Sequence, residues 1–403
     1  MDVQKIRADF PILSKGDQSP IYLDTACQSL RPRQVVEAMD SYYYEYPACG
    51  GRSVHRLATQ VSIKVDEARE KVSDFIGSDS YDQVIFTKSA TESINLIAKG
   101  LGLKRGDAVL TTDMEHNSNH VPWLHLKRTT GVDRVIVPTP DGGSFDLEEF
   151  KRSLTKKVRL VSVVQTNNVT GTTIPVKDIC QISHDNGSLV LVDGAQSAPH
   201  MPVDVVDMDV DFYAFSMHKM LGPSGVGILY GKKELLNNVE PLIVGGGGVS
   251  LTTYDKVELL PIPERFEAGL LNYAGIIGSG AAVDYLSAIG MDQVMEHDID
   301  CNRIVTDGLA NEEKVTVVGP GDPGLRGSIY SFNVRGMRSH DVAMILDEMA
   351  GVMIRSGMHC VHPYFLSRKI DGAARASFYI YTNQDECERF VQAVKETVRS
   401  FAT

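Results

Sequence analysis

A lysine that follows a short apolar segment is the first candidate for chemistry. The stretch DFYAFSMHKMLGPSGVGILY, residues 211–230, places Ser216, His218 and Lys219 directly after a predicted strand. In open α/β sheets, ligands bind beyond the carboxyl ends of the strands. A lysine in that place can bond covalently to a carbonyl compound once its amine is deprotonated. Taken alone, a loop lysine is more often simply solvated, so other residues must support this interpretation.

Three further segments carry polar residues at the ends of predicted strands. Asp193 ends LVLVD, where a carboxylate could bind a ribose, a metal or a pyridinium nitrogen, or form a turn before Gly194. Ala90 and Thr91 open a helix whose free N–H groups favour a phosphate, although such helix starts are also common as plain caps. His116 follows a fourth strand, where a lone histidine is usually a solvated loop residue.

The elements that position these residues alternate between strands and helices. Helical spacing of Val61, Val65, Ala68, Val72 and Phe75 indicates an amphipathic helix. Alternation of this kind, with nearly continuous apolar strands, predicts an α/β fold with a mainly parallel central sheet and helices on both faces. The expected strands are Gln83–Phe86, Ala108–Thr112, Arg134–Val137, Leu160–Gln165, Leu189–Asp193, Phe212–Phe215 and Gly227–Tyr230.

The C-terminal part predicts a smaller α+β domain with strands at Val315–Val318 and Ser328–Val334. Asn383 is the expected N-cap of a final helix, on which Cys387 belongs to the buried face. We expect an N-terminal segment at 1–20 that packs with the small domain, a large cofactor-binding domain at 21–285 and the small domain at 286–403. The junction between the domains is expected within Glu264–Gly290.

Composition excludes several classes of partner. The 403 residues carry a net charge of −12, which disfavours nucleic acid and anionic membrane surfaces as main partners. No run reaches the roughly 18 apolar residues of a membrane span, and the N-terminus lacks the pattern of a signal peptide, so the cytoplasm is the expected location. Six scattered cysteines form no C-x-x-C pair, and we expect no metal site.

In combination and order, these motifs resemble the class V aminotransferase family of fold-type I pyridoxal 5'-phosphate (PLP) enzymes. Within it the chain is most similar to the group II, SUF-type cysteine desulfurases and selenocysteine lyases. The resemblance runs from about Ile21 to Phe401. It rests on IYLDTA, SVHR, MEHNSNHVPW, NNVTGT, VDGAQ, DFYAFSMHK, GPSGVGILY, RFEAG and RASFYIY.

The resemblance implies a role for each candidate residue. Lys219 would bind PLP as a Schiff base and move the substrate Cα proton, and Asp193 would pair with the pyridine nitrogen. Gln196 would hydrogen-bond the ring hydroxyl, and His116 would stack on the ring and serve in proton transfer. The phosphate would be held by Ala90, Thr91, Ser216 and His218. Asn168 and Arg375 would receive the substrate carboxylate, and a guanidinium suits that task because it forms two parallel hydrogen bonds.

Cys360, in the loop IRSGMHCVHP, stands where the family has its sulfur-accepting cysteine. We expect the flanking His359 and His362 to stabilise its thiolate. The implied reaction converts L-cysteine to L-alanine and leaves a persulfide on Cys360, for iron–sulfur cluster or thio-cofactor synthesis. A homodimer and a sulfur-acceptor or iron–sulfur scaffold protein are the implied partners.

Two positions depart from the family pattern and weaken the substrate assignment. Leu270 follows RFEAG where the family has a threonine that reaches the partner's phosphate, and Cys27 stands where it has a small alanine. Other PLP reactions therefore stay open: selenocysteine lyase, cysteine sulfoxide lyase and amino-acid epimerase. A non-catalytic scaffold protein is a further alternative, although a purely structural role would require neither Lys219 nor Asp193.

Overall fold

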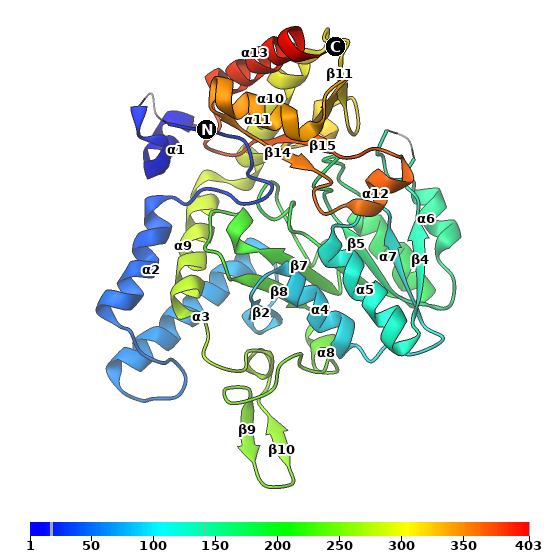
Figure 1. Cartoon of the computed structure of the whole chain (residues 1–403). Coiled ribbons are helices and arrows are strands. Elements are labelled where there is room, and N and C mark those ends of the chain that lie inside the picture. Colours follow the sequence, from blue (N-terminus) through cyan, green and yellow to red (C-terminus); the bar gives the residue numbers. More distant parts are fainter. Residues whose placement is uncertain (17–18, 141, 403) are drawn as a thin grey trace.

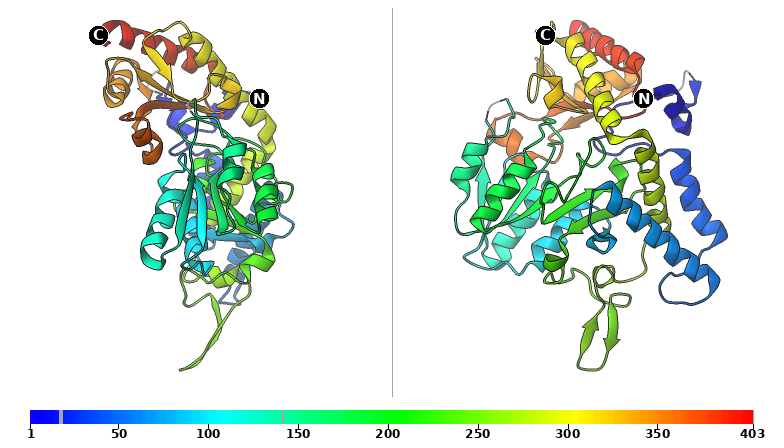
Figure 2. Two further views of the ribbon diagram at one scale, coloured as in Figure 1. Left: turned by 90° about the vertical axis from the view of Figure 1, so that its right-hand side faces the viewer. Right: turned by 180° about the vertical axis from the view of Figure 1, so that it is seen from behind.

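A central sheet covered by helices forms the larger part of the molecule, and a smaller α+β unit stands at one end of it (Figure 1). The computed structural model describes residues 1–16, 19–140 and 142–402. Figure 2 shows from the side and from behind that the smaller unit lies beyond one end of the sheet.

Within the described part of the chain, the central sheet has seven strands: β2 (Val84–Thr87), β3 (Ala108–Thr112), β4 (Asp133–Val137), β5 (Val158–Val164), β6 (Leu189–Asp193), β7 (Phe212–Ser216) and β8 (Gly227–Gly231). Their order is β2-β8-β7-β6-β5-β3-β4. The pairs from β7 to β4 are all parallel, and β8 runs antiparallel to both of its neighbours. The prediction of a mainly parallel sheet is therefore confirmed, with each expected strand found to within a few residues.

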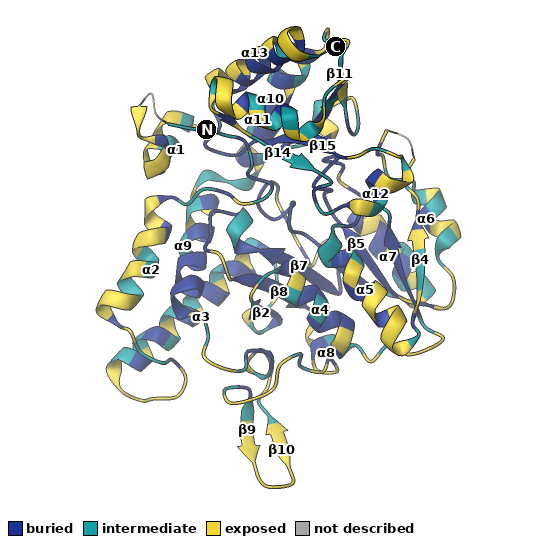
Figure 3. Ribbon diagram, viewed as in Figure 1, coloured by how far each residue is buried: buried dark blue, intermediate teal, exposed yellow. Residues whose placement is uncertain are grey.

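Successive residues of the strands point to opposite faces, so each face has its own helices. Val190 and Val192 pack in one core with α3 (Arg56–Phe75), α7 (Val176–Asn186) and α9 (Tyr273–Ile289). Leu191 packs in the other core with α4 (Ala90–Gly100) and α5 (Asn117–Thr130). Figure 3 shows most strands of the central sheet as buried between these layers, whereas the edge strand β4 is partly exposed. The helices of this part are α2 (Arg33–Glu45), α3 (Arg56–Phe75), α4 (Ala90–Gly100), α5 (Asn117–Thr130), α6 (Leu147–Ser153), α7 (Val176–Asn186), α8 (Lys233–Leu236) and α9 (Tyr273–Ile289).

The C-terminal unit contains an antiparallel sheet in the order β11-β12-β15-β14. Asn383 caps its last helix, accepting from the Glu386 N–H while the Glu386 carboxylate accepts from the Asn383 N–H, as predicted. Cys387 is fully buried in its core. The elements are β11 (Val315–Val317), β12 (Ile329–Val334), β14 (Arg355–Gly357), β15 (Ala373–Ser377), α10 (Met291–Leu309), α11 (Ser339–Ala350), α12 (His362–Ser367) and α13 (Gln384–Phe401).

The N-terminal residues contact the C-terminal unit. After helix α1 (Val3–Ala8), strand β1 (Ile21–Tyr22) pairs in parallel with β13 (Val352–Met353). Arg7 donates hydrogen bonds to the Tyr381 carbonyl at 2.6 Å and to Glu386 at 2.8 Å. The division of the chain at residues 20 and 285 stays a prediction.

A two-stranded hairpin, β9 (Val249–Thr252) and β10 (Val257–Leu259), projects from the end of the molecule opposite the C-terminal unit (Figure 1). Its residues are mostly exposed (Figure 3). Among the described residues, no single helix is long and apolar enough to cross a membrane. Helices α9 and α10 meet the length and composition criteria only as a pair that is bent by 76°.

Candidate active site

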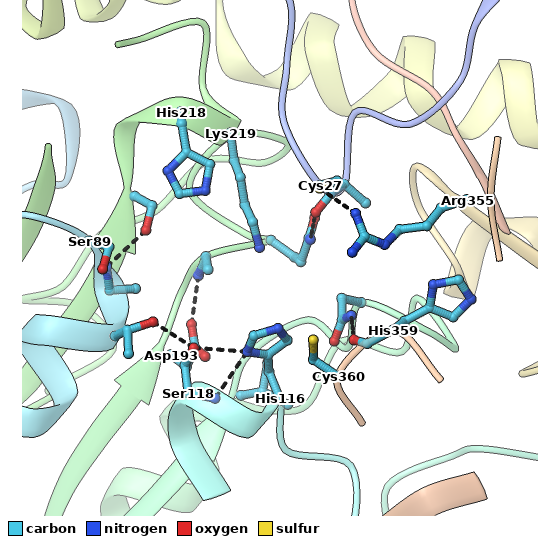
Figure 4. Close-up of a pocket in the computed structure, with 18 of the residues that line it drawn as sticks. Cys27, Ser89, His116, Ser118, Asp193, His218, Lys219, Arg355, His359 and Cys360 are labelled. Carbon is cyan, nitrogen blue, oxygen red and sulfur yellow. Dashed lines mark hydrogen bonds between the residues drawn. The ribbon is translucent and has the colours of Figure 1, made fainter. Parts of the chain in front are cut away.

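A cavity of about 170 Å³ lies where β6 and β7 end, between the central sheet and the C-terminal unit (Figure 4). Every residue that the sequence predicted for the site lines this cavity: Ala90, Thr91, His116, Asn168, Asp193, Gln196, Ser216, His218, Lys219, Cys360 and Arg375. The fold therefore brings together segments that are far apart in the chain, because parallel strands end at the same edge of the sheet.

Lys219 ends the short helix η4 (Met217–Lys219), which follows β7 without a gap. Figure 4 shows its amine directed into the cavity. Burial lowers the pKa of Lys219, and the attraction of Asp193 opposes this without cancelling it. A lowered pKa brings the side chain closer to the free amine, the form that bonds to an aldehyde and that accepts a proton.

Asp193 and Gln196 form the floor of the cavity. Burial raises the pKa of the Asp193 carboxyl, while the charge of Lys219 and the Ala195 N–H lower it. A cationic ring nitrogen beside Asp193 would further favour the carboxylate. The Gln196 amide donates to the Ala26 carbonyl at 2.7 Å, which leaves its buried Oε1 without a partner in the described chain. This unpaired acceptor fits a hydroxyl on a bound ring.

The first turn of α4 and the end of β7 could together hold an anion. The Ala90 N–H donates to Ser216 Oγ at 2.8 Å, and Thr91 Oγ1 lies 2.6 Å from Ser118 Oγ. The helix dipole and the unpaired N–H groups of a first turn favour negative charge. His218 stands beside them, and burial lowers its pKa to about 4, so it acts there as a neutral imidazole.

His116 is the N-cap of α5, and its ring faces Lys219 across the cavity (Figure 4). Its Nδ1 accepts the Ser118 N–H at 3.1 Å, so the proton of the neutral ring resides on Nε2. Burial, followed by the charges of Lys219 and Arg375, lowers the pKa of His116 to about 3. The ring is therefore neutral near pH 7, which suits stacking against a cationic heterocycle.

Arg375 lies on β15 with 2% of its side chain exposed. Its Nη1 donates to the Asn168 carbonyl at 2.9 Å, and its Nη2 lies 3.2 Å from Asp24 Oδ1. Arg375 Nε and Asn168 Oδ1 are buried and have no partner in the described chain. Because a buried donor without a partner is costly, Nε marks a place for a ligand acceptor such as a carboxylate.

Cys360 lies in the loop between β14 and α12, and Figure 4 shows its sulfur facing the cavity. His359 and Cys360 have φ values of 46° and 60°, in the left-handed region that non-glycine residues rarely adopt. Two hydrogen bonds hold this segment: Asn117 N–H to the Cys360 carbonyl at 2.7 Å, and the Asn168 amide to the His359 carbonyl at 2.9 Å. Such maintained strain is typical of functional sites.

The expected stabilisation of the Cys360 thiolate by a charged His359 is wrong. Burial lowers the pKa of His359 to about 2, and its Nε2 is bound to the Ala373 carbonyl at 2.9 Å. His362 is turned toward Asn117, with 3.0 Å between Nδ1 and the amide nitrogen. Lys219 lines the same cavity as Cys360, and a negative charge on Cys360 would oppose the lowering of the Lys219 pKa by burial.

Several residues of the cavity wall were given no role by the sequence motifs. Arg355 at the start of β14 contacts Cys27, with 2.6 Å between Nη1 and Sγ. Ser118 links Thr91 to His116 through its hydroxyl. Arg355 and Ser118 both lie inside segments that the sequence analysis quoted, so their position next to predicted site residues was the available signal.

The family model described as "Aminotransferase class-V" matches residues 21–390. A protein of Halobacterium salinarum named "Probable cysteine desulfurase" is 40% identical over 409 residues, covering all of this chain and 98% of that protein. Among solved structures, the apo cysteine desulfurase of Thermococcus onnurineus NA1 superposes with a TM-score of 0.94 at 38% identity, covering 99% of this chain and 98% of that one. The cysteine desulfurase CsdA of Escherichia coli gives 0.91 at 32%, with 99% of both chains covered.

These matches extend over nearly the whole chain and confirm the fold class that the sequence predicted. The groups that line the cavity also fit PLP, independently of these matches. Lys219 offers an amine, Asp193 a buried carboxylate, Gln196 an unpaired acceptor, and the start of α4 a site for a phosphate. The chain belongs to the class V aminotransferase family, and its cofactor is pyridoxal phosphate.

Proposed function

We propose that the chain is a cysteine desulfurase that converts L-cysteine to L-alanine and stores the sulfur as a persulfide on Cys360. The observation that carries this proposal is the convergence of Cys360, Lys219 and Arg375 on one small cavity. A nucleophile, a base and a carboxylate receptor are the groups that this reaction requires. The names of the relatives support the same activity.

Bound PLP supplies an electron sink that weakens the bonds at the substrate Cα. Lys219 would hold the cofactor covalently, Asp193 would keep its ring nitrogen protonated and Gln196 would bind its hydroxyl. His116 would cover one ring face as a neutral imidazole. The phosphate would be held by Ala90, Thr91, Ser216 and His218.

Arg375 and Asn168 orient the substrate in this proposal. Arg375 is immobilised by the Asn168 carbonyl and by Asp24, and its unpaired Nε remains available for a carboxylate oxygen. Little rotamer freedom is lost on binding because the guanidinium is already fixed. Asn168 also donates to the His359 carbonyl at 2.9 Å, so the carboxylate would lie near the loop that carries Cys360.

Lys219, once released by the incoming amino group, takes the Cα proton with its free amine. The Cys360 thiolate then attacks the substrate sulfur. A sulfur–sulfur bond forms, the bond from Cβ to sulfur breaks, and its electron pair stays on carbon until protons complete alanine. Cys360 retains the sulfur as a persulfide, so one thiol and one cysteine yield one persulfide and one alanine.

The partners of the reaction also belong to this proposal. A persulfide needs an acceptor, and a sulfur-accepting protein or iron–sulfur scaffold would receive it for cluster or thio-cofactor synthesis. A homodimer is proposed as the working form, with Leu270 near the cofactor phosphate of the other subunit. Leu270 is 69% exposed in the single chain, so it is available for such a contact.

The decisive experiment compares the wild-type holoenzyme with Cys360→Ala. Both proteins should retain the yellow cofactor and change its spectrum when L-cysteine is added. Only the wild type should release alanine and show a persulfide after alkylation and peptide mapping. Cys49→Ala is the matched control, because Cys49 is also partly exposed but lies outside the cavity.

Undiminished alanine production in Cys360→Ala, with no persulfide on any peptide, would reject the desulfurase proposal. A PLP lyase or an epimerase would then be the better assignment, because those reactions need no protein thiol. A purified protein without colour that cannot be loaded with PLP would instead support the scaffold alternative.

A further inference from the structure

Two of the six cysteines line the same cavity, although the proposed reaction uses only one. Cys27 and Cys360 are both partly exposed and both form part of its wall. The other four lie elsewhere: Cys180, Cys301 and Cys387 are buried in the apolar cores, and Cys49 contacts Tyr273. The position of Cys27 thus calls for a separate explanation.

Three hydrogen bonds fix the backbone at Ala26 and Cys27. The Cys27 N–H donates to the Asp24 carbonyl at 3.1 Å. The preceding Ala26 accepts from the Gln196 amide at 2.7 Å and donates to Ser377 Oγ at 2.9 Å. These bonds fix the backbone that carries the Cys27 thiol at the cavity wall. The thiol is therefore part of the built site, beside the residue proposed to bind the cofactor hydroxyl.

A guanidinium is directed at the sulfur of Cys27. Arg355 Nη1 lies 2.6 Å from Cys27 Sγ and 3.9 Å from Asp24 Oδ2. Figure 4 shows the guanidinium pointing toward Cys27. Arginine stays charged at all physiological pH values and has only donors to offer. A sulfur that faces such a group is suited to carry negative charge, as a thiolate or as a persulfide anion.

The small size of the cavity favours transfer of a sulfur atom between Cys360 and Cys27. Both thiols line the cavity into which the Lys219 amine points, and a negative charge on either one would raise the Lys219 pKa. The cavity measures only about 170 Å³, and the buried, unpartnered Nε of Arg375 shows that it is built for a ligand. Cys360 belongs to a strained loop segment with φ of 60°, whereas Cys27 belongs to a firmly bonded turn. A direct transfer of sulfur requires the two thiols to come into contact within this cavity.

We infer that Cys27 is a second sulfur carrier, which takes the outer sulfur of the Cys360 persulfide and holds it against Arg355. The Cys27 thiolate attacks the outer sulfur, a new sulfur–sulfur bond forms on Cys27, and Cys360 leaves as a thiolate. One persulfide is consumed and one is formed, so the exchange needs no oxidant or reductant. The inference rests on the proposed function, since Cys360 must first acquire the sulfur.

This relay predicts how much alanine is released when no acceptor or reductant is present. Transfer to Cys27 frees Cys360 for a second cycle, so the wild-type holoenzyme should release about two alanines per chain, and Cys27→Ala about one. In time-resolved alkylation and peptide mapping, the persulfide should appear first on Cys360 and later on Cys27. Cys360→Ala should carry it on neither residue. Arg355→Ala should reduce the share found on Cys27.

Each other outcome would contradict the relay to Cys27, the proposed desulfurase function, or both. A wild-type persulfide on Cys360 alone, with one alanine per chain, overturns the relay and leaves the desulfurase proposal intact. A persulfide on Cys27 in Cys360→Ala shows that Cys27 attacks the substrate itself, and this overturns both assignments. An equal persulfide on Cys49 overturns the relay, because the transfer would then not need the cavity. No persulfide anywhere rejects the proposed function together with the inference.

Discussion

Burial determines the protonation of individual residues around the cavity. His116 and His359 are neutral because their rings are removed from water and face cations. Lys219 is affected in the same way, which favours the free amine that the proposed proton transfer requires. Glu115, next to His116, shows the effect most clearly. Its fully buried carboxyl is bound by Thr112 at 2.7 Å and by Asn119 at 2.6 Å, both neutral partners.

We expect the Glu115 carboxyl to make the stability of the protein fall as the pH rises. Burial raises its pKa to about 8, so between its unfolded value and pH 8 the folded state holds one proton more than the unfolded state. Stability from this group is complete at low pH and is lost as the pH rises toward 8, by up to about 1.4 kcal/mol per pH unit. Glu115→Gln cannot ionise, so its melting temperature relative to wild type should rise from pH 5 to pH 8.

The exposed Glu396→Gln on α13 serves as the control and should follow the wild-type melting curve at every pH. Parallel pH profiles for Glu115→Gln and wild type would show that the Glu115 carboxyl is ionised in the folded protein.

Among the elements, strand β8 pairs with both strands that lead into the predicted phosphate site, β2 before α4 and β7 before Lys219. Gly227 pairs with Thr87 on β2 and with Ser216 on β7. A Cβ atom on Gly227 would lie 2.4 Å from the backbone of Ser89, directly before α4. Only glycine allows the start of α4 to approach the end of β7 so closely, and Ala90 reaches Ser216 at this place.

Gly227→Ala is therefore expected to displace the start of α4 and to weaken the binding of PLP about tenfold or more, a loss of at least ~1.4 kcal/mol. The dissociation constant of PLP, measured by fluorescence titration of the apoprotein, tests this. Gly231→Ala, on the same strand, is the matched control. Its Cβ would press on the side chains of Leu236 and Phe212, so it should lower stability without the same loss of PLP affinity. Equal losses in both variants would assign the effect to stability alone.

In the molecule as a whole, the β9–β10 hairpin has apolar side chains that nothing in the described part of the single chain covers. It projects from the body and exposes apolar side chains: Leu251 at 51%, Tyr254 at 105% and Val257 at 61%. A projecting apolar ribbon is typical of a surface that a partner covers. This agrees with the homodimer proposed above.

We expect the protein to sediment as a dimer, and Val257→Glu to shift it toward monomer, because the variant would bury an unpaired charge in the interface. Sedimentation velocity over a range of concentrations measures this shift. Leu325→Glu is the control, because Leu325 is similarly exposed at 60% but lies in the C-terminal unit. A wild-type monomer at micromolar concentration would contradict the prediction.

The sequence by itself determined the strands, the helices and most of the cavity wall. Short apolar runs such as those ending at Asp193 and Ser216 are typical of strands buried between two helical layers. Since parallel strands end at one edge, residues that follow them had to meet there, and Lys219 did so with Asp193 and His116. Local chemistry was sufficient for the cap at Asn383 as well, because that bond spans only three residues.

Only the tertiary structure decided which distant groups face each other and which of them carry charge. The contact between Arg355 and Cys27 joins residues 328 positions apart, and no local pattern encodes it. His359 seemed able to assist Cys360 from its place in the loop, yet its ring is bound to the Ala373 carbonyl and is neutral. Protonation follows from burial and from neighbours in space, and these exist only after the two parts of the chain have packed together.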